Sequence, residues 1–310
     1  MSKKVLLATV KPFSQNARDQ VTALVEKAGY EARVLEAYKD KSELLKAVAD
    51  VDALIVRSDK IDSEVLEAAK ELKLVVRAGA GYDNVDCETA KKRGVSVMNT
   101  PGQNANAVAE LAAGMMVYMA RGQFNGKPGT ELKGKRLGLL AIGAVGGAVA
   151  AIAKGFGMSI RAYDKFVEDA KIKDMGVEPK ASPEELFKDS DYLSLHIPAT
   201  AETRGSIGRE LISLMPAGGT LLNTARAEVI NEGELVEIMG ERDDIRYVTD
   251  IAPSADIDTV LKEKYSSRYY ATPKKMGAQT EEANVNAGTA AARQIIGFFE
   301  ENIRKFIVNA

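Results

Sequence analysis

Short runs of apolar residues alternate with amphipathic segments along the chain, which is the pattern of a parallel α/β protein. In the first part, the segments 17–29 and 63–72 have apolar positions at helical spacing, and Gly29 ends the first of them. Around these helices lie runs rich in Val, Leu and Ile that predict buried strands, at 5–9, 31–37, 53–58 and 74–79.

The first series breaks near Asn99, where a strand ends in Asn-Thr-Pro-Gly and a long apolar helix follows from about Asn106. A second series follows, with strands predicted at 135–143, 159–164, 192–198, 219–225 and 246–252. Helices are predicted between them at 144–156, 182–189, 209–215 and 232–242, and a last helix at 281–302. We therefore predict an α/β fold with two Rossmann-like, doubly wound parallel-sheet domains and a cleft between them. The first would comprise residues 1–98 and 285–310, because the last helix returns to it, and the second residues 99–284.

The composition is that of a globular protein without a strong charge. Apolar residues make up 45% and charged residues 28%, and the formal net charge of −2 provides no basic field for nucleic acid or anionic lipid. The single cysteine, Cys87, excludes an intramolecular disulfide and a cysteine-based metal cluster. No apolar stretch approaches the roughly 20 residues of a membrane span, and the N-terminus lacks a signal-peptide pattern. We expect a soluble cytoplasmic protein with no metal, nucleic-acid or membrane partner.

A glycine turn after the strand at 135–143 suggests a nucleotide site. It reads Ala141-x-Gly143-x-x-Gly146, with alanine in place of the first glycine of the usual dinucleotide-binding motif. Asp164 ends the next strand, 18 residues after Gly146. An alanine fits the first position where its φ is negative, so we expect a negative φ at Ala141.

Each part of this segment has a chemical reason. Gly143 lets the backbone approach a pyrophosphate, and Gly146 permits close packing of helix on strand. The free N–H groups near Ala144 and Val145 would face the anion. Asp164 would accept hydrogen bonds from the adenosine ribose and repel a 2′-phosphate, so the predicted cofactor is NAD rather than NADP.

Four further motifs occur in order around this turn. They are VRAGAGYDNVD (76–86), NTPGQNANAVAEL (99–111), LSLHIPATAETRG (193–205) and LLNTARAEVINEGEL (221–235). Together with the turn they resemble the D-2-hydroxyacid dehydrogenase family over essentially the whole chain. Within it the sequence is most similar to short members, without the C-terminal regulatory domain of longer ones, that oxidise D-3-phosphoglycerate. The resemblance thus implies an NAD-dependent enzyme that forms 3-phosphohydroxypyruvate, the first step of phosphorylated serine biosynthesis, as a homodimer through the nucleotide domains.

The resemblance also implies roles for residues toward the substrate. Arg226, in the N-T-A-R motif, would bind the substrate carboxylate in a two-point fork and polarise the C2 oxygen. The loop formed by Ala78, Gly79, Ala80 and Gly81 would offer backbone N–H groups to the same carboxylate. Arg57 and Ser58 are candidates for the phosphate end.

The second domain would hold the cofactor. The resemblance places Asp250 on the nicotinamide side, and His196 and Pro198 in a turn that lines the cofactor cleft. The remaining expected cofactor contacts are Thr224, Ala225 and Gly277. His196 is the only histidine, and its position in this turn favours a packing or hydrogen-bonding role over acid–base catalysis.

The sequence departs from the family at the acid–base pair. Most members have a histidine in T-P-H-x-G, with a glutamate partner, whereas this chain has T-P-K-K-M-G, and Ala255 stands at the glutamate position. Counting forward from Thr272 places Lys274 at the histidine position, and counting back from Gly277 places Lys275 there. The longer downstream match favours Lys275, and both remain candidates.

Loss of the glutamate is consistent with gain of a lysine. A lysine pKa is ordinarily ~10.4, and a carboxylate partner would raise it further. Arg226, the neighbouring lysine and desolvation would instead lower it toward a useful value. The neutral lysine would take the hydroxyl proton as the C2 hydride passes to NAD, so oxidation should favour alkaline pH.

Two alternatives remain open at this point. The chain could be another member of the family, such as a hydroxypyruvate or glyoxylate reductase, because Arg57 favours a phosphorylated substrate only weakly. It could also be a non-catalytic NAD-sensing protein that keeps the fold after loss of the histidine and glutamate.

Overall fold

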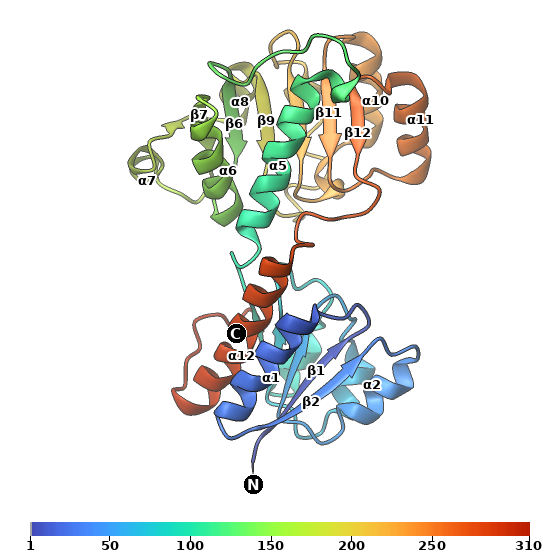
Figure 1. Ribbon diagram of the computed structural model, residues 1–310, viewed down its shortest axis with the longest axis vertical. Coiled ribbons are helices and arrows are strands. Elements are labelled where there is room, and N and C mark those ends of the chain that lie inside the picture. The colour runs from blue at the N-terminus through green and yellow to red at the C-terminus, as the bar shows by residue number, and fades with distance from the viewer. Residues whose placement is uncertain (1) are drawn as a thin grey trace. The chain divides into compact units, whose positions relative to one another are not determined.

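The computed structural model describes residues 2–310, which divide into two compact α/β units (Figure 1). The first unit runs up to Asn104 and includes Gln279–Ala310, and the second is Ala105–Ala278. The predicted boundaries at 98/99 and 284/285 differ from these by a few residues. Residues after Asn99 stay with the first unit because Thr100 N donates to Gly79 O (2.9 Å).

The first unit contains a five-stranded parallel sheet in the order β2-β1-β3-β4-β5. Its strands are β1 (Lys4–Thr9), β2 (Glu31–Glu36), β3 (Ala53–Val56), β4 (Leu74–Arg77) and β5 (Ser96–Asn99). Its helices are α1 (Gln15–Lys27), α2 (Lys41–Ala47), α3 (Ser63–Ala68), α4 (Cys87–Lys92) and α12 (Glu281–Glu300).

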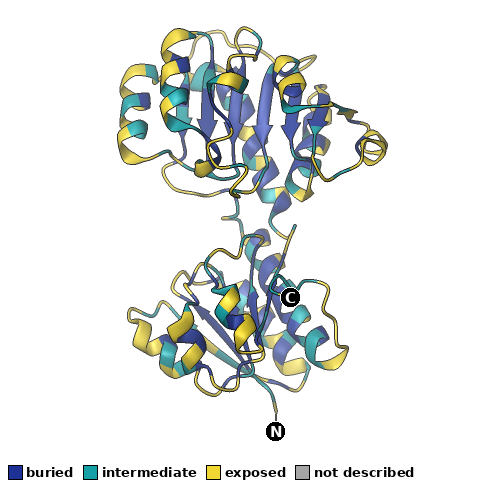
Figure 2. Ribbon diagram, turned by 180° about the vertical axis from the view of Figure 1, so that it is seen from behind, coloured by how far each residue is buried: buried dark blue, intermediate teal, exposed yellow. Residues whose placement is uncertain are grey.

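Alternate residues of each strand in this sheet enter two different cores, as the pleat requires. Val5 and Leu7 pack with α1 and α12 on one face, while Leu6 and Ala8 pack with the helices of the other face. The sheet is therefore covered on both sides, and Figure 2 shows its inner strands largely buried and the outer helix surfaces exposed. The last helix returns to this unit, as predicted.

The second unit contains a seven-stranded parallel sheet in the order β12-β11-β10-β9-β6-β7-β8. Its strands are β6 (Arg136–Leu140), β7 (Ser159–Tyr163), β8 (Glu178–Pro179), β9 (Tyr192–Leu195), β10 (Thr220–Asn223), β11 (Arg246–Thr249) and β12 (Tyr269–Ala271). Its helices are α5 (Ala105–Ala120), α6 (Ala144–Gly155), α7 (Asp169–Asp174), α8 (Pro183–Lys188), α9 (Arg209–Ile212), α10 (Glu232–Glu241) and α11 (Ala255–Tyr265), with short 3₁₀ turns at Gly122–Phe124 and Ala227–Val229.

The direction in which strands are added reverses once in each sheet. In the second unit the chain goes from β6 outward to β7 and β8, and then returns to place β9 on the other side of β6. In the first unit the same reversal occurs between β1 and β3. Open parallel sheets bind ligands beyond the carboxyl ends of the strands at such a reversal, which directs attention to that edge of each sheet. Within residues 2–310, no helix has the length and apolar character that a membrane span requires.

Candidate active site

The predicted functional residues of the second unit all follow carboxyl ends of its strands. In spatial order along the sheet, the 272–277 loop follows β12, Asp250 follows β11, Thr224–Arg226 follow β10, His196 follows β9, the glycine turn follows β6 and Asp164 follows β7. Because the strands are parallel, these segments share one edge. The fold therefore brings together residues that are more than 100 positions apart in the sequence.

The glycine turn after β6 is tightly closed. A Cβ at Gly146 would lie 2.4 Å from the carbonyl oxygen of Ala141, so only glycine allows α6 to approach the strand this closely. The expectation of a negative φ at Ala141 was wrong, because its φ is +75°. Its N–H donates to Tyr163 O (2.8 Å) across to β7, and this bond holds an alanine in a conformation that favours glycine.

The helix that follows this turn has an open N-terminus. Gly143 is the N-cap and provides no side-chain hydrogen bond, and the first helical bond runs from Gly147 N to Gly143 O (2.9 Å). The N–H groups of Ala144, Val145 and Gly146 find no acceptor within residues 2–310. Unpaired N–H groups and the helix dipole together favour an anion at this position.

Asp164 holds the same turn against the end of β7. Its Oδ2 accepts from Ile142 N (2.8 Å), and its Oδ1 accepts from Phe166 N (2.8 Å) and Val167 N (3.2 Å). A carboxylate offers about four lone-pair sites, so these three bonds leave capacity for a ribose hydroxyl. The structural part of this role was not predicted from the sequence.

His196 lies beside the glycine turn and is uncharged at neutral pH. Its backbone N–H donates to Leu140 O (2.9 Å), and its ring atom Cδ2 lies 3.5 Å from where a Cβ at Gly146 would be. Burial lowers the pKa of His196 to about 4, and its buried Nε2 has no hydrogen-bond partner among the described residues. These observations favour the packing role that the sequence suggested. Pro198, two residues further, is exposed.

Arg226 lies in a turn that is held by Asn223, the asparagine of the N-T-A-R motif. Asn223 is fully buried at the end of β10, where its Nδ2 donates to Arg226 O (2.8 Å) and its Oδ1 accepts from Ala225 N (3.0 Å). The Arg226 guanidinium donates to Ala225 O (2.9 Å) and has no carboxylate oxygen within 4.0 Å in the described part of the chain. The neighbouring hydroxyl of Thr224 is buried without a hydrogen-bond partner in residues 2–310. Arg226 is thus a half-buried cation at an edge with unsatisfied polar atoms.

The two lysines lie on the exposed loop after β12. Asp250, which is 1% exposed, lies beneath this loop and accepts hydrogen bonds from it, including one from Gly277 N (2.8 Å). Lys274 and Lys275 are both exposed. Ala255 is the exposed first residue of α11, so no carboxylate arises from that position.

Arg57 marks the carboxyl edge of the sheet in the first unit. Its guanidinium donates to Pro12 O (2.9 Å) and Lys11 O (3.2 Å) and lies 4.9 Å from the centroid of the Phe13 ring. Burial lowers the pKa of Arg57 from its ordinary value. No carboxylate oxygen lies within 4.0 Å of this guanidinium among residues 2–310, and Ser58 beside it is exposed. This cation is held in place by an aromatic face and two carbonyls.

The glycine loop after β4 presents fewer unpaired N–H groups than expected. The N–H of Ala78 is not available to a substrate, because it donates to Val56 O (2.8 Å). The N–H groups of Gly79, Ala80 and Gly81 have no acceptor in the described chain. Gly79 has a φ of +147°, and a Cβ there would lie 1.7 Å from an Arg77 nitrogen. The loop therefore needs glycine and offers three N–H groups rather than four.

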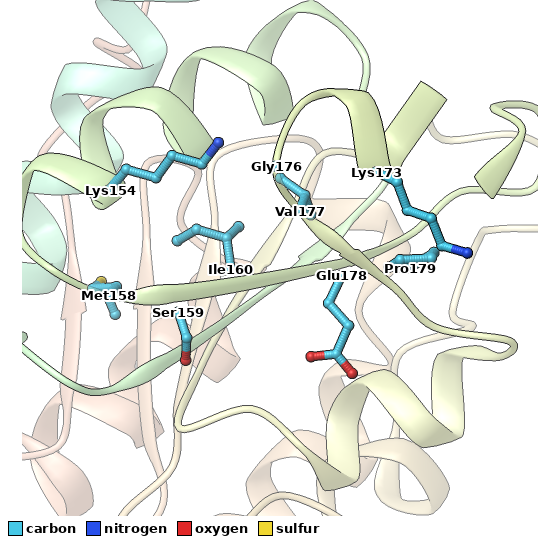
Figure 3. A pocket seen from close by; sticks show the side chains of 9 residues that line it. All are labelled: Lys154, Met158, Ser159, Ile160, Lys173, Gly176, Val177, Glu178 and Pro179. Carbon is cyan, nitrogen blue, oxygen red and sulfur yellow. The ribbon is translucent and has the colours of Figure 1, made fainter. Parts of the chain in front are cut away.

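A hollow of about 510 Å³ lies elsewhere on the second unit (Figure 3). It is lined by residues that include Lys154, Met158, Ser159, Lys173 and Glu178. Ser159 begins β7 whereas Asp164 follows its last residue, so the hollow lies at the opposite end of this strand. It contains none of the candidate site residues.

The fold and these two edges define a two-unit α/β protein with a glycine turn of the dinucleotide-binding type. The chain belongs to the D-isomer specific 2-hydroxyacid dehydrogenase family, whose catalytic-domain model matches residues 8–309.

Individual relatives agree with this assignment. The solved structure of NAD⁺-bound 3-phosphoglycerate dehydrogenase from Entamoeba histolytica is 46% identical, with a TM-score of 0.91, and the match covers 100% of this chain and 99% of that one. D-3-phosphoglycerate dehydrogenase from Methanocaldococcus jannaschii is 36% identical over 291 residues, 87% of this chain and 54% of the relative. Hydroxypyruvate reductase from Thermotoga maritima is 42% identical over 221 residues, 67% of this chain and 71% of the relative. The chain thus spans about half the length of the Methanocaldococcus jannaschii relative.

Proposed function

We propose that the chain catalyses the NAD-dependent oxidation of D-3-phosphoglycerate to 3-phosphohydroxypyruvate, the reaction that opens phosphorylated serine biosynthesis. The observation that carries the proposal is the 46% identity to the NAD⁺-bound 3-phosphoglycerate dehydrogenase of Entamoeba histolytica over the whole chain. The chemistry of the two strand edges supports it independently.

The residues after β6 and β7 fit NAD. The three unpaired N–H groups of Ala144, Val145 and Gly146 would take the pyrophosphate. The remaining lone pairs of Asp164 would take the adenosine ribose, and its charge would disfavour the 2′-phosphate of NADP. We further propose contacts to the cofactor from Gly143, His196, Pro198, Thr224, Ala225, Asp250 and Gly277. When bound, NAD accepts the hydride that leaves C2 of the substrate.

The charged residues supply the rest of the reaction. Arg226 would bind the substrate carboxylate and stabilise negative charge that develops on the C2 oxygen, helped by N–H groups of Gly79–Gly81. Arg57 and Ser58 would take the phosphate. A neutral lysine, Lys275 or Lys274, would accept the hydroxyl proton as the C2–H bond breaks and the carbonyl forms. Since lysine must be neutral for this step, the rate of oxidation should rise with pH.

Steady-state assays test this function directly. NADH formation should be faster with D-3-phosphoglycerate than with D-glycerate or D-lactate, and should increase between pH 7 and pH 10. One of the variants Lys274→Ala and Lys275→Ala should lose at least ~100-fold in kcat, the size of effect typical of a general base. If both variants keep near-full turnover, the lysine assignment is wrong. NAD binding without NADH formation from any 2-hydroxy acid would instead indicate a non-catalytic sensor.

A second candidate is reduction of hydroxypyruvate, or of the related glyoxylate, by NADH. The 42% identity to the Thermotoga maritima hydroxypyruvate reductase favours it. The substrates of the two candidate reactions differ in whether they carry a phosphate, so Arg57→Ala separates them. If the protein is a phosphoglycerate dehydrogenase, this variant raises KM for the phosphorylated substrate and leaves KM for unphosphorylated ones unchanged. If it is a hydroxypyruvate reductase, the parent protein already uses the phosphorylated ketoacid no better than hydroxypyruvate.

We also propose that the protein is a cytoplasmic homodimer. The single free cysteine, Cys87, suits a reducing compartment, and the family implies a dimer through the nucleotide-binding unit. Light scattering coupled to size-exclusion chromatography gives the mass that tests the dimer.

A further inference from the structure

The loop that carries the two lysines is attached at both ends to one buried carboxylate. At its start, the Thr272 hydroxyl donates to Asp250 Oδ1 (2.9 Å). At its end, Met276 N donates to the same oxygen (2.9 Å) and Gly277 N donates to Oδ2 (2.8 Å). Only residues 273–275 lie between the two attachment points. A side chain that is 1% exposed therefore determines where a short exposed segment can go.

Two more contacts tighten these attachments. The Thr272 hydroxyl also reaches the backbone oxygen of Asp250 (2.9 Å), and Thr272 N donates to Thr249 O (3.0 Å), which continues the pairing of β11 with β12. At the other end, a Cβ at Gly277 would lie 3.0 Å from Asp250 Oδ2. The backbone thus lies close against the carboxylate, and a side chain at this position would have to displace it by a few tenths of an ångström.

We propose that Asp250 and Thr272 are positioning residues that hold the proton-transferring lysine in register with the reacting hydroxyl. A lysine has a flexible four-carbon stem, so its ammonium group is only as well placed as the backbone from which it extends. Fixing both ends of a three-residue segment restricts that backbone. Misplacing a catalytic group by 1 Å can cost about 100-fold in rate, so such an attachment has a large effect on turnover. This proposal rests on the proposed function in one respect, namely that one of the two lysines transfers the proton.

The Thr272→Val variant tests the attachment, because it keeps the shape of the side chain and removes the hydroxyl. We expect kcat to fall about tenfold through misplacement of the lysine, with KM for substrate and Kd for NAD within twofold of the parent. Hydrogen exchange at the amides of Met276 and Gly277 should become faster. Thr272→Ser, which restores the hydroxyl, should restore both readouts. The matched control is Thr289→Val in α12, where a threonine that is 6% exposed loses a hydroxyl bond to Val285 O (2.8 Å) and kcat should not change.

A double-mutant cycle separates positioning from a general loss of structure. When Thr272→Val is combined with the lysine-to-alanine variant that loses turnover, kcat should fall no further than in the lysine variant alone. If kcat of the double variant instead falls by the product of the two single losses, the two residues act independently and the proposal is overturned. So would an unchanged kcat in Thr272→Val despite faster amide exchange.

Other outcomes identify which idea has failed. If neither lysine variant loses turnover, the proposed proton transfer fails, and this inference fails with it. If a lysine variant does lose turnover but the double-mutant cycle shows no coupling with Thr272→Val, only the proposed positioning role of Asp250 and Thr272 fails. Should Thr272→Val not fold, Thr272→Ala also removes the hydroxyl, and the same tenfold loss and the same non-additivity are expected.

Discussion

The two parallel sheets share the arrangement around their first strand and differ in the helix that follows it. β1 lies between β2 and β3, as β6 lies between β7 and β9. The helix after β1 is capped by Ser14, whose hydroxyl accepts from Ala17 N (3.2 Å), whereas the helix after β6 begins at Gly143 with no side-chain cap. The other helices of the first unit before α5 are also capped, by Asp40, Asp62 and Asp86.

This difference shows that the topology alone does not select the nucleotide site. A capped N-terminus has already used one of its free N–H groups on a side chain of the protein, while an uncapped one keeps all of them for an anion. A second difference concerns the residue that follows the neighbouring strand on the other side of the first strand, which is β3 in the first unit and β9 in the second. Arg57 follows β3 and is a cation, whereas His196 follows β9 and is neutral. Both differences support the proposed roles, with a small anionic group at the first edge and the dinucleotide at the second.

The largest effect is expected from closing the space at Gly146. In Gly146→Ala the new Cβ meets a backbone oxygen at 2.4 Å, and relieving this overlap should cost about 1–3 kcal/mol of stability. The displaced helix start should also weaken NAD binding by roughly 100-fold, or ~2.7 kcal/mol. Calorimetric titration measures the affinity. The matched control is Gly147→Ala in the same helix, whose Cβ meets nothing within 4 Å and which should bind NAD normally. Normal binding by Gly146→Ala would mean that this turn does not hold the cofactor.

Capping the open helix tests the comparison itself. Gly143 has a φ of −67° and open space at its Cβ position, so Gly143→Asp is sterically allowed. The new carboxylate should stabilise the fold by about 1 kcal/mol and weaken NAD binding roughly 30-fold, because it takes the N–H groups and repels the phosphates. The Gly143→Ala variant adds a methyl group that cannot accept a hydrogen bond, so it shows how much of each effect is due to the added carbon atom rather than to the cap. In the first unit, Ser14→Ala should lose about 1 kcal/mol without changing NAD affinity. Chemical denaturation measures the stability of each variant, and calorimetric titration measures its affinity for NAD. An unchanged NAD affinity in Gly143→Asp would contradict the idea that the missing cap leaves this helix start free for the cofactor.

The neutral state of His196 predicts a specific loss of stability in acid. Its pKa of about 4 in the folded protein lies below the ordinary value of 6.5, so the unfolded chain binds more protons between these values. Stability is therefore fully present above pH 6.5 and falls as the pH drops toward 4. Relative to the non-titrating His196→Gln variant, the native protein should lose about 2 kcal/mol more between pH 7 and pH 5. Urea denaturation at both pH values measures the difference, and parallel losses in the two proteins would show that His196 is not protected from protonation.

Much of the architecture could be predicted because it depends on local pattern. The alternation of apolar strands with helices indicated two parallel α/β units, and the last helix does return to the first. The strands β8 and β12 were missed because they have two and three residues, too few to show a period. The helices α2, α4, α7 and α11 were also not predicted, and length does not explain this, because α11 has 11 residues whereas α9, which was predicted, has four.

The candidate site was predicted less completely, because its contacts join distant parts of the chain. The motifs identified Asp250 and the lysine loop separately, but the bonds from Asp250 to Met276 and Gly277 span 26 and 27 residues. The positive φ of Ala141 likewise depends on a bond to Tyr163 from the neighbouring strand. Residue type predicts what a side chain can do, and long-range hydrogen bonds decide which of these possibilities the fold uses.

The smallest effect is expected at Ala141, which has a counterpart in the first unit. Ala141 follows β6 with a φ of +75° and donates to Tyr163 O at the end of β7. Ala37 follows β2 with a φ of +53° and donates to Thr9 O (3.0 Å) at the end of β1. A left-handed conformation costs a non-glycine residue about 1–2 kcal/mol, but glycine costs about 0.5–1 kcal/mol in unfolded-state freedom.

Ala141→Gly and Ala37→Gly should therefore each stabilise the protein by less than about 1 kcal/mol, as measured by thermal unfolding. They should differ in binding. A more flexible turn has to be ordered around the pyrophosphate, so Ala141→Gly should weaken NAD binding about twofold to fivefold, which corresponds to the roughly 0.5–1 kcal/mol that ordering a glycine costs beyond an alanine. Ala37→Gly should leave it unchanged, because the helices on either side of it are capped. Equal effects of the two variants on NAD affinity would contradict the assignment of the cofactor to the turn before α6.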